Sequence, residues 1–280
     1  MKKKFIAITF LLLITFGMIG CGKNQVLKKE NVNETNQEQA TENKETAEEQ
    51  QENTNNDTEE QSQSQIDYIN IAPEEVKIPI LMYHSISDED PSNNLLVPPA
   101  MFEEQMAWLE ANNFTAMNMD EALEAMRTGK VPKRPVVITF DDGYANNYTS
   151  AFPSLKNHKL KATFFVITDG VDNGYYMSSD NLKEMQEAGM SIENHTANHL
   201  ELNNLSKTDA YESIKRAQDY LRNVIGSDGN YLCYPVGKYN DETIQIEEEL
   251  GIKAAVTTQG GFASINDGLH TLKRVRISPM

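Results

Sequence analysis

Two of the five histidines, His195 and His199, lie four residues apart and directly follow a predicted strand at residues 191–194. On a helical turn, residues i and i+4 share one face, so both imidazoles can point at the same ion. Two histidines and one carboxylate, with open positions for water and substrate, make a catalytic metal site. The pair therefore indicates metal chemistry, although two histidines can also share a surface by chance.

Two adjacent carboxylates, Asp141 and Asp142, follow the apolar segment 136–140 and precede Gly143. Neighbouring carboxylates at a buried strand end repel each other, and both ionise readily only if a cation shares the site. Taken alone, the same pattern is typical of a turn with a helix-capping aspartate. Together with the histidine pair, it favours a metal centre.

The elements that must position these residues alternate along the chain. Short apolar segments alternate with helix-like ones from residue 78 onward, which is the pattern of β/α units around a parallel sheet. We predict strands at residues 80–83, 115–119, 136–140, 162–167, 191–194, 231–234, 254–257 and 272–277. We predict helices at residues 101–112, 120–127 (capped by Asp120), 206–224 and 241–250. The fold class is α/β, a barrel of about seven units rather than an open sheet, with its chemistry at the C-terminal strand ends.

The N-terminal quarter has the composition of an export signal followed by a spacer. Three lysines and a short apolar run end at Cys21, and residues 18–21 resemble a bacterial lipobox. We expect a signal peptide at residues 1–20, lipid on Cys21, a disordered polar tether at residues 21–65 and a catalytic domain at residues 66–280. An uncleaved signal anchor is the alternative. Either form holds the domain outside the cytoplasm, on the outer face of the cytoplasmic membrane.

The net charge of -17 makes the chain a poor candidate for binding nucleic acid. It suits a neutral or cationic substrate and a bound divalent metal. Two cysteines cannot make a disulfide framework, and if Cys21 carries lipid, Cys233 has no partner. We therefore expect Cys233 to be a small buried apolar residue.

The two carboxylate and histidine motifs together resemble those of the polysaccharide deacetylases of carbohydrate esterase family 4. The resemblance covers about residues 78–278 and rests on TFDDG at residues 139–143 and HTANH at residues 195–199. It implies that Asp142, His195 and His199 bind a divalent metal, commonly zinc, with cobalt, nickel or manganese as other options. It also implies that Asp141 is the general base, and that the fold is a distorted, incomplete (β/α) barrel.

A third motif at residues 232–240 resembles the family's but departs from it at Cys233, where most members have an arginine that orients the base. A small residue before Tyr-Pro, together with residues 79–84, looks more like the branch that de-N-acetylates poly-N-acetylglucosamine exopolysaccharide. In that branch's arrangement, the backbone N–H of Tyr234 would help to hold the oxyanion.

The last predicted strand offers a replacement for the absent arginine. The period of two in residues 272–277 puts Arg274 and Arg276 on one face and Val275 and Ile277 on the other. We hypothesise that Arg274 points toward the site and orients the base; a plain surface salt bridge is the alternative.

The family's usual general acid, a histidine in a Leu-x-His motif, is not matched. His270 lies close in sequence but in a different local pattern, and His158 is expected at the surface. His84, at the end of the first strand, is the better candidate for lining the pocket. Possible sugar-stacking residues are Trp108, Tyr144, Tyr148 and Tyr239, although Trp108 fits a core position better.

Together with the resemblance to the de-N-acetylating branch, these residues predict metal-assisted hydrolysis of N-acetyl groups on a β-linked N-acetylglucosamine polymer, with release of acetate. Peptidoglycan glycan strands are the second candidate substrate, and O-acetyl esters of other polysaccharides are the third. Because two of the family's catalytic supports are absent, a non-catalytic glycan-binding protein is the alternative from another class.

Overall fold

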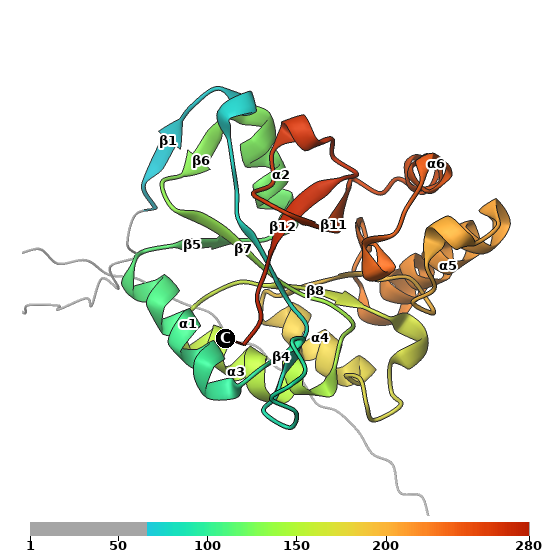
Figure 1. Cartoon of the computed structure of the whole chain (residues 1–280), viewed down its shortest axis with the longest axis horizontal. Helices are drawn as coiled ribbons and strands as arrows, with labels where there is room; N and C mark the ends of the chain where they lie inside the picture. Colours follow the sequence, from blue (N-terminus) through green and yellow to red (C-terminus); the bar gives the residue numbers. More distant parts are fainter. Residues whose placement is uncertain (1–65, 280) are drawn as a thin grey trace, which may run out of the picture. The chain divides into compact units, whose positions relative to one another are not determined.

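A closed ring of seven parallel strands forms the centre of the domain (Figure 1). The computed structural model describes residues 66–279. The ring follows the order β2-β12-β11-β10-β9-β8-β7, and β7 pairs with β2 to close it. The strands are β2 (Ile80–Tyr83), β7 (Pro135–Phe140), β8 (Thr163–Val166), β9 (Ser191–Asn194), β10 (Tyr231–Cys233), β11 (Ala254–Gly260) and β12 (Leu272–Arg276).

All eight predicted strands are confirmed, with ends that differ by no more than a few residues. The eighth, β5 (Thr115–Met117), pairs with β7 outside the ring. The ring is distorted, because β9 and β10 share one residue pair and the register between β11 and β12 shifts after Val256. Short strands that were not predicted form two small ribbons: β1 (Tyr68–Asn70) with β6 (Lys130–Pro132), and β3 (Ser85–Ile86) with β4 (Leu96–Val97).

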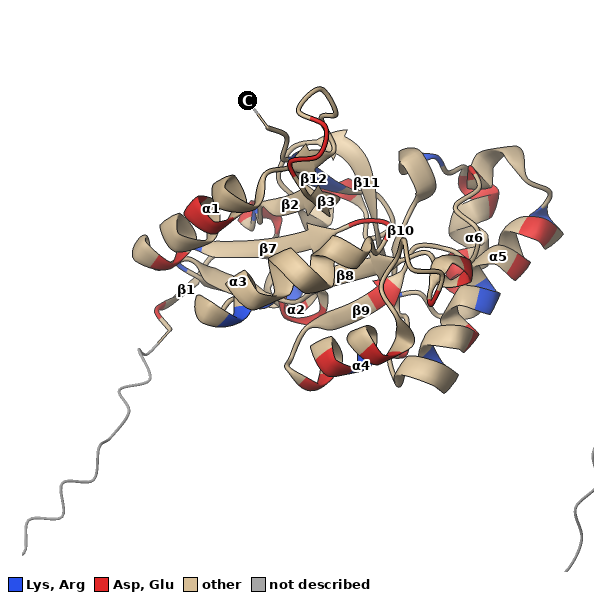
Figure 2. Ribbon diagram, turned by 90° about the horizontal axis from the view of Figure 1, so that it is seen from below, with Lys and Arg blue, Asp and Glu red and all other residues tan. Residues whose placement is uncertain are grey.

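Helices cover the outside of the ring, and acidic residues occur along several of them (Figure 2). They are α1 (Pro99–Ala111), α2 (Met119–Thr128), α3 (Phe152–Asn157), α4 (Ser179–Glu187), α5 (Lys207–Tyr220) and α6 (Asp241–Leu250). The predicted helix at residues 206–224 is confirmed as α5, which Ser206 caps, and it continues beyond Tyr220 as a π-helical turn, Leu221–Ile225.

The predicted cap of α2 is wrong by two residues. Asn118 caps the helix, because its side chain accepts the N–H of Glu121 while the Glu121 carboxylate accepts the N–H of Asn118. This reciprocal pair satisfies two donors that the helix leaves free. Asp120 lies inside the first turn, where it accepts hydrogen bonds from Tyr231 and Lys253.

Three apolar clusters hold the ring and its helices together. One fills the barrel and continues onto α2, which closes the barrel at the N-terminal ends of the strands. A second packs the outer strand faces against α1, α3 and α4, and a third packs β10 and β11 against α5 and α6. Each of the three clusters joins side chains from several strands and helices.

No helix among residues 66–279 has the length and apolar character needed to cross a membrane. The predicted signal peptide, the lipidated Cys21 and the tether lie outside the described residues.

Candidate active site

The first two motifs meet at the C-terminal ends of the strands, as barrel chemistry requires. Asp141 and Asp142 follow β7, and His195 follows β9. Ligand atoms of Asp142, His195 and His199 all lie within 4.8 Å of one another. The Nε2 atoms of His195 and His199 are 3.2 Å and 3.4 Å from Asp142 Oδ1. Three donors of the types that zinc prefers therefore converge on one point.

The backbone that brings the two histidines together is not the helical turn we expected. Residues 195–199 form bends without helical hydrogen bonding, and Thr196 and His199 have φ values of 64° and 54°. The His199 N–H donates to Thr196 Oγ1 at 3.0 Å, which closes the turn. The left-handed backbone conformations of Thr196 and His199 turn the chain back on itself, so the two imidazoles meet although they do not share a helix face.

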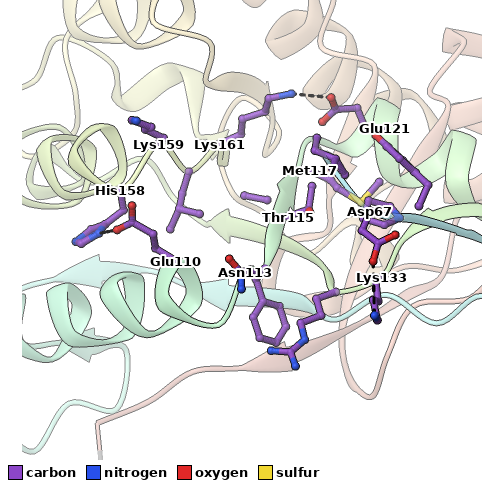
Figure 3. A pocket seen from close by; sticks show the side chains of 17 residues that line it. Asp67, Glu110, Asn113, Thr115, Met117, Glu121, Lys133, His158, Lys159 and Lys161 are labelled. Atoms are coloured by element: carbon purple, nitrogen blue, oxygen red, sulfur yellow. Dashed lines mark hydrogen bonds and ion pairs between the residues drawn. The ribbon is translucent and has the colours of Figure 1, made fainter. Parts of the chain in front are cut away.

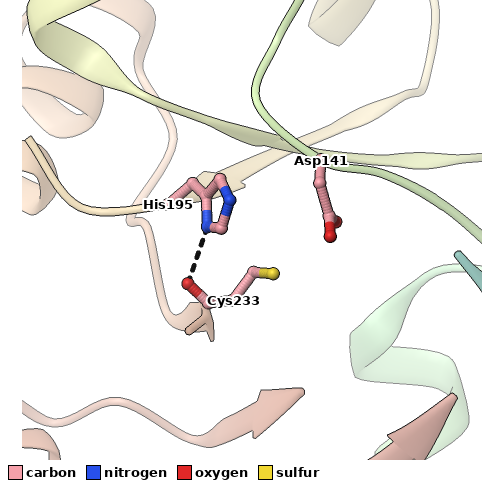
Figure 4. Close-up of side chains that lie close together, drawn as sticks. All are labelled: Asp141, His195 and Cys233. Atoms are coloured by element: carbon pink, nitrogen blue, oxygen red, sulfur yellow. Dashed lines mark hydrogen bonds between the residues drawn. The ribbon is translucent and has the colours of Figure 1, made fainter. Parts of the chain in front are cut away.

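A hydrogen bond fixes the tautomer of His195. Its Nδ1 lies 2.7 Å from the backbone carbonyl oxygen of Cys233 (Figure 4). A carbonyl only accepts, so Nδ1 carries a proton, and Nε2 is the nitrogen that faces Asp142 and can bind a cation once its own proton is lost. Burial alone would lower the pKa of His195, but the neighbouring Asp142 carboxylate contributes to raising it well above its usual value. The donor set therefore fits a cation.

Arg274 forms a bidentate ion pair with Asp141. Arg274 Nη1 and Nη2 donate to the two carboxylate oxygens of Asp141, each at 2.7 Å. Arg274 is 1% exposed, so the alternative of a plain surface salt bridge is wrong. Although burial favours the neutral acid, Arg274 holds the pKa of Asp141 far below its usual range. The carboxylate is therefore ionised and fixed in orientation.

Neighbouring groups occupy the remaining donors of Arg274. Its Nε donates to the Thr257 carbonyl at 2.9 Å, Nη1 also donates to Thr139 Oγ1 at 3.1 Å, and Nη2 contacts Cys233 Sγ at 3.3 Å. These contacts hold the guanidinium rigidly. In the ring, β2 lies between β12, which carries Arg274, and β7, which leads to Asp141.

His84 also lies next to the Asp141 carboxylate. Its Nε2 is 3.7 Å from Asp141 Oδ2, and its side chain is largely buried. Burial lowers the pKa of His84, which favours the neutral imidazole at neutral pH. A neutral ring here can accept or donate one hydrogen bond at the edge of the site.

The backbone N–H of Tyr234 is not free for an oxyanion. It donates to the Val256 carbonyl at 3.3 Å, so the expected donor is engaged in the sheet. Two residues later, Val236 has a φ of 49°, and within residues 66–279 no carbonyl or side chain accepts its N–H. Such a backbone conformation is strained for a β-branched residue, and strain of this kind concentrates at functional sites. Sequence reasoning missed Val236.

Comparison with known proteins shows which family this chain belongs to. The pattern of the family described as "Polysaccharide deacetylase" matches residues 128–255. The Bacillus subtilis protein YxkH, named as a polysaccharide deacetylase, is 40% identical over 204 residues, which cover 72% of this chain and 72% of the relative. This chain belongs to the polysaccharide deacetylase family. It is therefore an enzyme, a hydrolase that acts on amide bonds.

Two further relatives sharpen the comparison. The deacetylase PplD of Streptococcus pyogenes, solved with acetate, is 36% identical with a TM-score of 0.71; the match covers 73% of this chain and 93% of that one. The poly-β-1,6-N-acetyl-D-glucosamine N-deacetylase of Staphylococcus epidermidis is 28% identical over 225 residues, covering 71% of this chain and 78% of the relative. The expected barrel with its deacetylase fold is thus confirmed.

The departure at Cys233 makes room for Arg274. Cys233 is buried, as expected, and its sulfur lies within 4.8 Å of ligand atoms of both Asp141 and His195. A side chain at this position thus lies beside the Asp141 carboxylate, at the place where the third motif of the deacetylase family usually has its arginine. In this deacetylase β12 supplies the guanidinium, and the small thiol leaves space for it.

The other two histidines make contacts away from the metal group. His270 Nδ1 lies 2.6 Å from Glu247 Oε2, and the His270 carbonyl accepts the hydroxyl of Tyr234, whose ring belongs to the cluster beneath α5 and α6. His158 lies between Glu103 and Glu110 of α1, at 2.9 Å and 2.6 Å. Both positions are structural ion-pair positions in this deacetylase.

A cavity of about 770 Å³ lies at the N-terminal ends of the strands (Figure 3). Its lining includes the ion pairs Lys133 with Asp67 and Lys161 with Glu121. None of the predicted catalytic or metal-binding residues lines it. The deacetylase chemistry therefore belongs to the opposite end of the barrel.

Proposed function

We propose that this enzyme removes N-acetyl groups from a β-linked N-acetylglucosamine polysaccharide of the poly-N-acetylglucosamine type, in a metal-dependent reaction that releases acetate. The observation that carries the proposal is the Arg274-held carboxylate of Asp141 beside the convergent group Asp142, His195 and His199. The similarity to the Staphylococcus epidermidis N-deacetylase supports the choice of substrate.

Asp142, His195 and His199 would hold zinc, or else cobalt, nickel or manganese. When bound, such a cation polarises the acetyl carbonyl and makes a nearby water more acidic. The fixed orientation of His195 suits this role, because its Nε2 already faces Asp142.

Asp141 acts as the general base. Arg274 keeps it ionised and aimed, so it can accept the proton of the attacking water at its carboxylate oxygen. The same ion pair makes Asp141 a weak base, and proton transfer to it therefore depends on a water that has already become acidic. His84, whose Nε2 lies 3.7 Å from Asp141 Oδ2, lines the acetyl pocket beside this carboxylate.

The tetrahedral oxyanion needs a donor as well as the cation. We assign this donor to the N–H of Val236 rather than that of Tyr234, whose N–H is bonded to Val256. A backbone donor fixed before the reaction lowers the barrier because it needs no reorganisation when charge develops.

The N-terminal residues suggest where the reaction takes place. We propose cleavage after residue 20, lipid on Cys21 and a location on the outer face of the bacterial cytoplasmic membrane, with residues 21–65 as tether. Cys21→Ser should move the enzyme from the membrane fraction to the medium. Retention of the variant at the membrane would contradict lipid anchoring and favour an uncleaved anchor.

Acetate release from a β-1,6-linked N-acetylglucosamine oligomer tests the reaction. The purified enzyme is assayed with zinc, with cobalt and with chelator, beside Asp141→Asn. We expect metal-dependent release that the substitution abolishes. Release from peptidoglycan or O-acetylated xylan but not from the oligomer would overturn the substrate assignment, and no release from any of them would favour a glycan-binding role.

A further inference from the structure

The loop between β8 and α4 is hydrogen-bonded to the backbone directly after Asp142. Tyr144 and Tyr176 form an antiparallel bridge. The Ala145 N–H donates to the Tyr175 carbonyl at 3.0 Å, and the Met177 N–H donates to the Gly143 carbonyl at 2.9 Å. The loop therefore lies against the corner that follows the two catalytic carboxylates.

Three tyrosine rings meet where the loop is fastened. The ring of Tyr175 is nearly perpendicular to those of Tyr144 and Tyr176, at 85° to both, with centroids 5.5 Å and 5.1 Å away. Tyr144 and Tyr176 stack on each other at 5.5 Å. Tyr175 is 65% exposed, more than any other large hydrophobic side chain in residues 66–279. Two rings thus support a third that faces solvent.

The rings of Tyr144, Tyr175 and Tyr176 form an aromatic platform, and short-range contacts make this platform rigid. Asn173 Oδ1 accepts the N–H groups of both Tyr175 and Tyr176, at 2.9 Å and 3.1 Å. Gly170 lets the ring of Tyr176 approach the backbone, because a Cβ at this position would lie 2.5 Å from the ring. An exposed tyrosine held in this way loses little conformational freedom when it binds a ligand.

The platform is also connected to the metal-binding group. Burial and the nearby Asp142 carboxylate raise the pKa of Tyr144 above its usual range. A sugar that contacts the Tyr175 ring is therefore held by a loop that is hydrogen-bonded to the residues directly after Asp142.

We propose that Tyr175 stacks on a pyranose ring of the polymer next to the N-acetylglucosamine unit that is deacetylated. A β-linked pyranose carries axial C–H groups on its faces and polar groups around its edge, so a flat aromatic ring matches its face. This inference rests on the proposed function. It makes Tyr175 a positioning residue that selects polymer over isolated acetyl compounds.

The test compares a long and a short substrate in Tyr175→Ala, Tyr175→Phe and wild type. For a β-1,6-linked pentasaccharide we expect Tyr175→Ala to raise KM about tenfold, a stacking contribution of about 1.4 kcal/mol. Tyr175→Phe should keep the wild-type KM, because it keeps the ring. Hydrolysis of 4-nitrophenyl acetate, which has no second sugar, should be unchanged in both variants.

Trp108→Ala is the matched control. Trp108 is also an exposed aromatic residue, at 57%, but it lies near the C-terminal end of α1 and packs on Phe114, which lines the cavity at the opposite end of the barrel. Its loss should leave the pentasaccharide KM unchanged. An equal rise in KM for Trp108→Ala would overturn the proposal, as would an unchanged KM in Tyr175→Ala.

Calorimetric binding of the pentasaccharide in an Asp141→Asn background separates this inference from the proposed reaction. If the wild type releases no acetate, the reaction fails as proposed, yet weaker binding in Asp141→Asn with Tyr175→Ala still supports the platform. Equal binding with and without the Tyr175 ring overturns the platform, whatever the enzyme hydrolyses.

Discussion

The two ends of the barrel differ in how they hold charge. At the catalytic end, Asp141 and Arg274 form a buried pair, whereas left-handed φ values of non-glycine residues occur at both ends, for example at Asp142 and Val236 at the catalytic end and at Asn113 and Lys159 at the other. At the other end, pairs such as Lys161 with Glu121 are solvent-exposed. Costly arrangements persist where the surrounding structure enforces them and a reaction uses them.

The largest expected contrast comes from breaking one ion pair at each end. Arg274→Ala leaves Asp141 buried and unpaired, which should cost about 3–5 kcal/mol of stability, together with at least about a hundredfold in turnover. Lys161→Ala should cost less than about 1 kcal/mol and leave turnover unchanged. Urea unfolding and acetate release measure both quantities. Similar losses for the two variants would contradict the contrast.

The next effect distinguishes the histidines of the two ends. Zinc at a hundredfold excess over its Kd should stabilise the wild type by about 2.7 kcal/mol, because it binds only the folded enzyme. His199→Ala should lose most of this gain, whereas His158→Ala should keep it. Thermal unfolding of each variant with and without zinc measures how much of the zinc-induced stabilisation that variant keeps. A full zinc response in His199→Ala would remove His199 from the ligand set.

Two glycines with positive φ sharpen the comparison of backbones. A Cβ at Gly237 would lie 2.2 Å from Thr258 Oγ1, whereas a Cβ at Gly189, after α4, meets nothing within 4 Å. Gly189→Ala should cost about 1 kcal/mol from its backbone conformation alone. Gly237→Ala should cost more, about 2–3 kcal/mol, and should slow turnover because Val236 moves with it. Equal stability of the two variants would contradict this steric argument.

The smallest effect is pH-dependent and lies away from the active site. The hydrogen bonds that His158 donates to the Glu110 and Glu103 carboxylates raise the pKa of His158. A raised pKa means that the folded state binds the proton more tightly, so the stabilisation is complete below the unfolded-state pKa and disappears as pH rises through the folded-state pKa. His158→Gln should therefore cost at most about 1 kcal/mol at pH 5.5 and almost nothing at pH 9. Denaturant midpoints at both pH values check it; a larger loss at pH 9 would contradict the sign.

The sequence was most informative where a pattern is local. Apolar segments predicted every strand of the ring, because buried parallel strands need them on both faces. The cap of α2 was misplaced, since Asn118 and Asp120 both have capping side chains and the sequence does not distinguish them. The spacing of His195 and His199 predicted their meeting but not the turn that produces it, because two left-handed residues have no clear sequence signal.

Longer-range features were harder to predict. The alternation in residues 272–277 suggested that Arg274 points inward, but its contact with Asp141 depends on how the ring closes. Nothing in the sequence marks Val236 as the residue whose N–H has no acceptor, since that depends on the bond between Tyr234 and Val256. Tyr175 was overlooked because exposure is a property of the fold, not of the residue type.

The origin of Arg274 also links activity to folding order. The guanidinium comes from the last strand of the ring, and the carboxylate it orients lies 133 residues earlier in the chain. Contacts of such long sequence separation form slowly, because the intervening chain must first be organised. A partly folded chain could already bring Asp142 and the two histidines together, yet Asp141, the proposed base, would still lack its partner Arg274. We therefore expect activity only when the barrel closes.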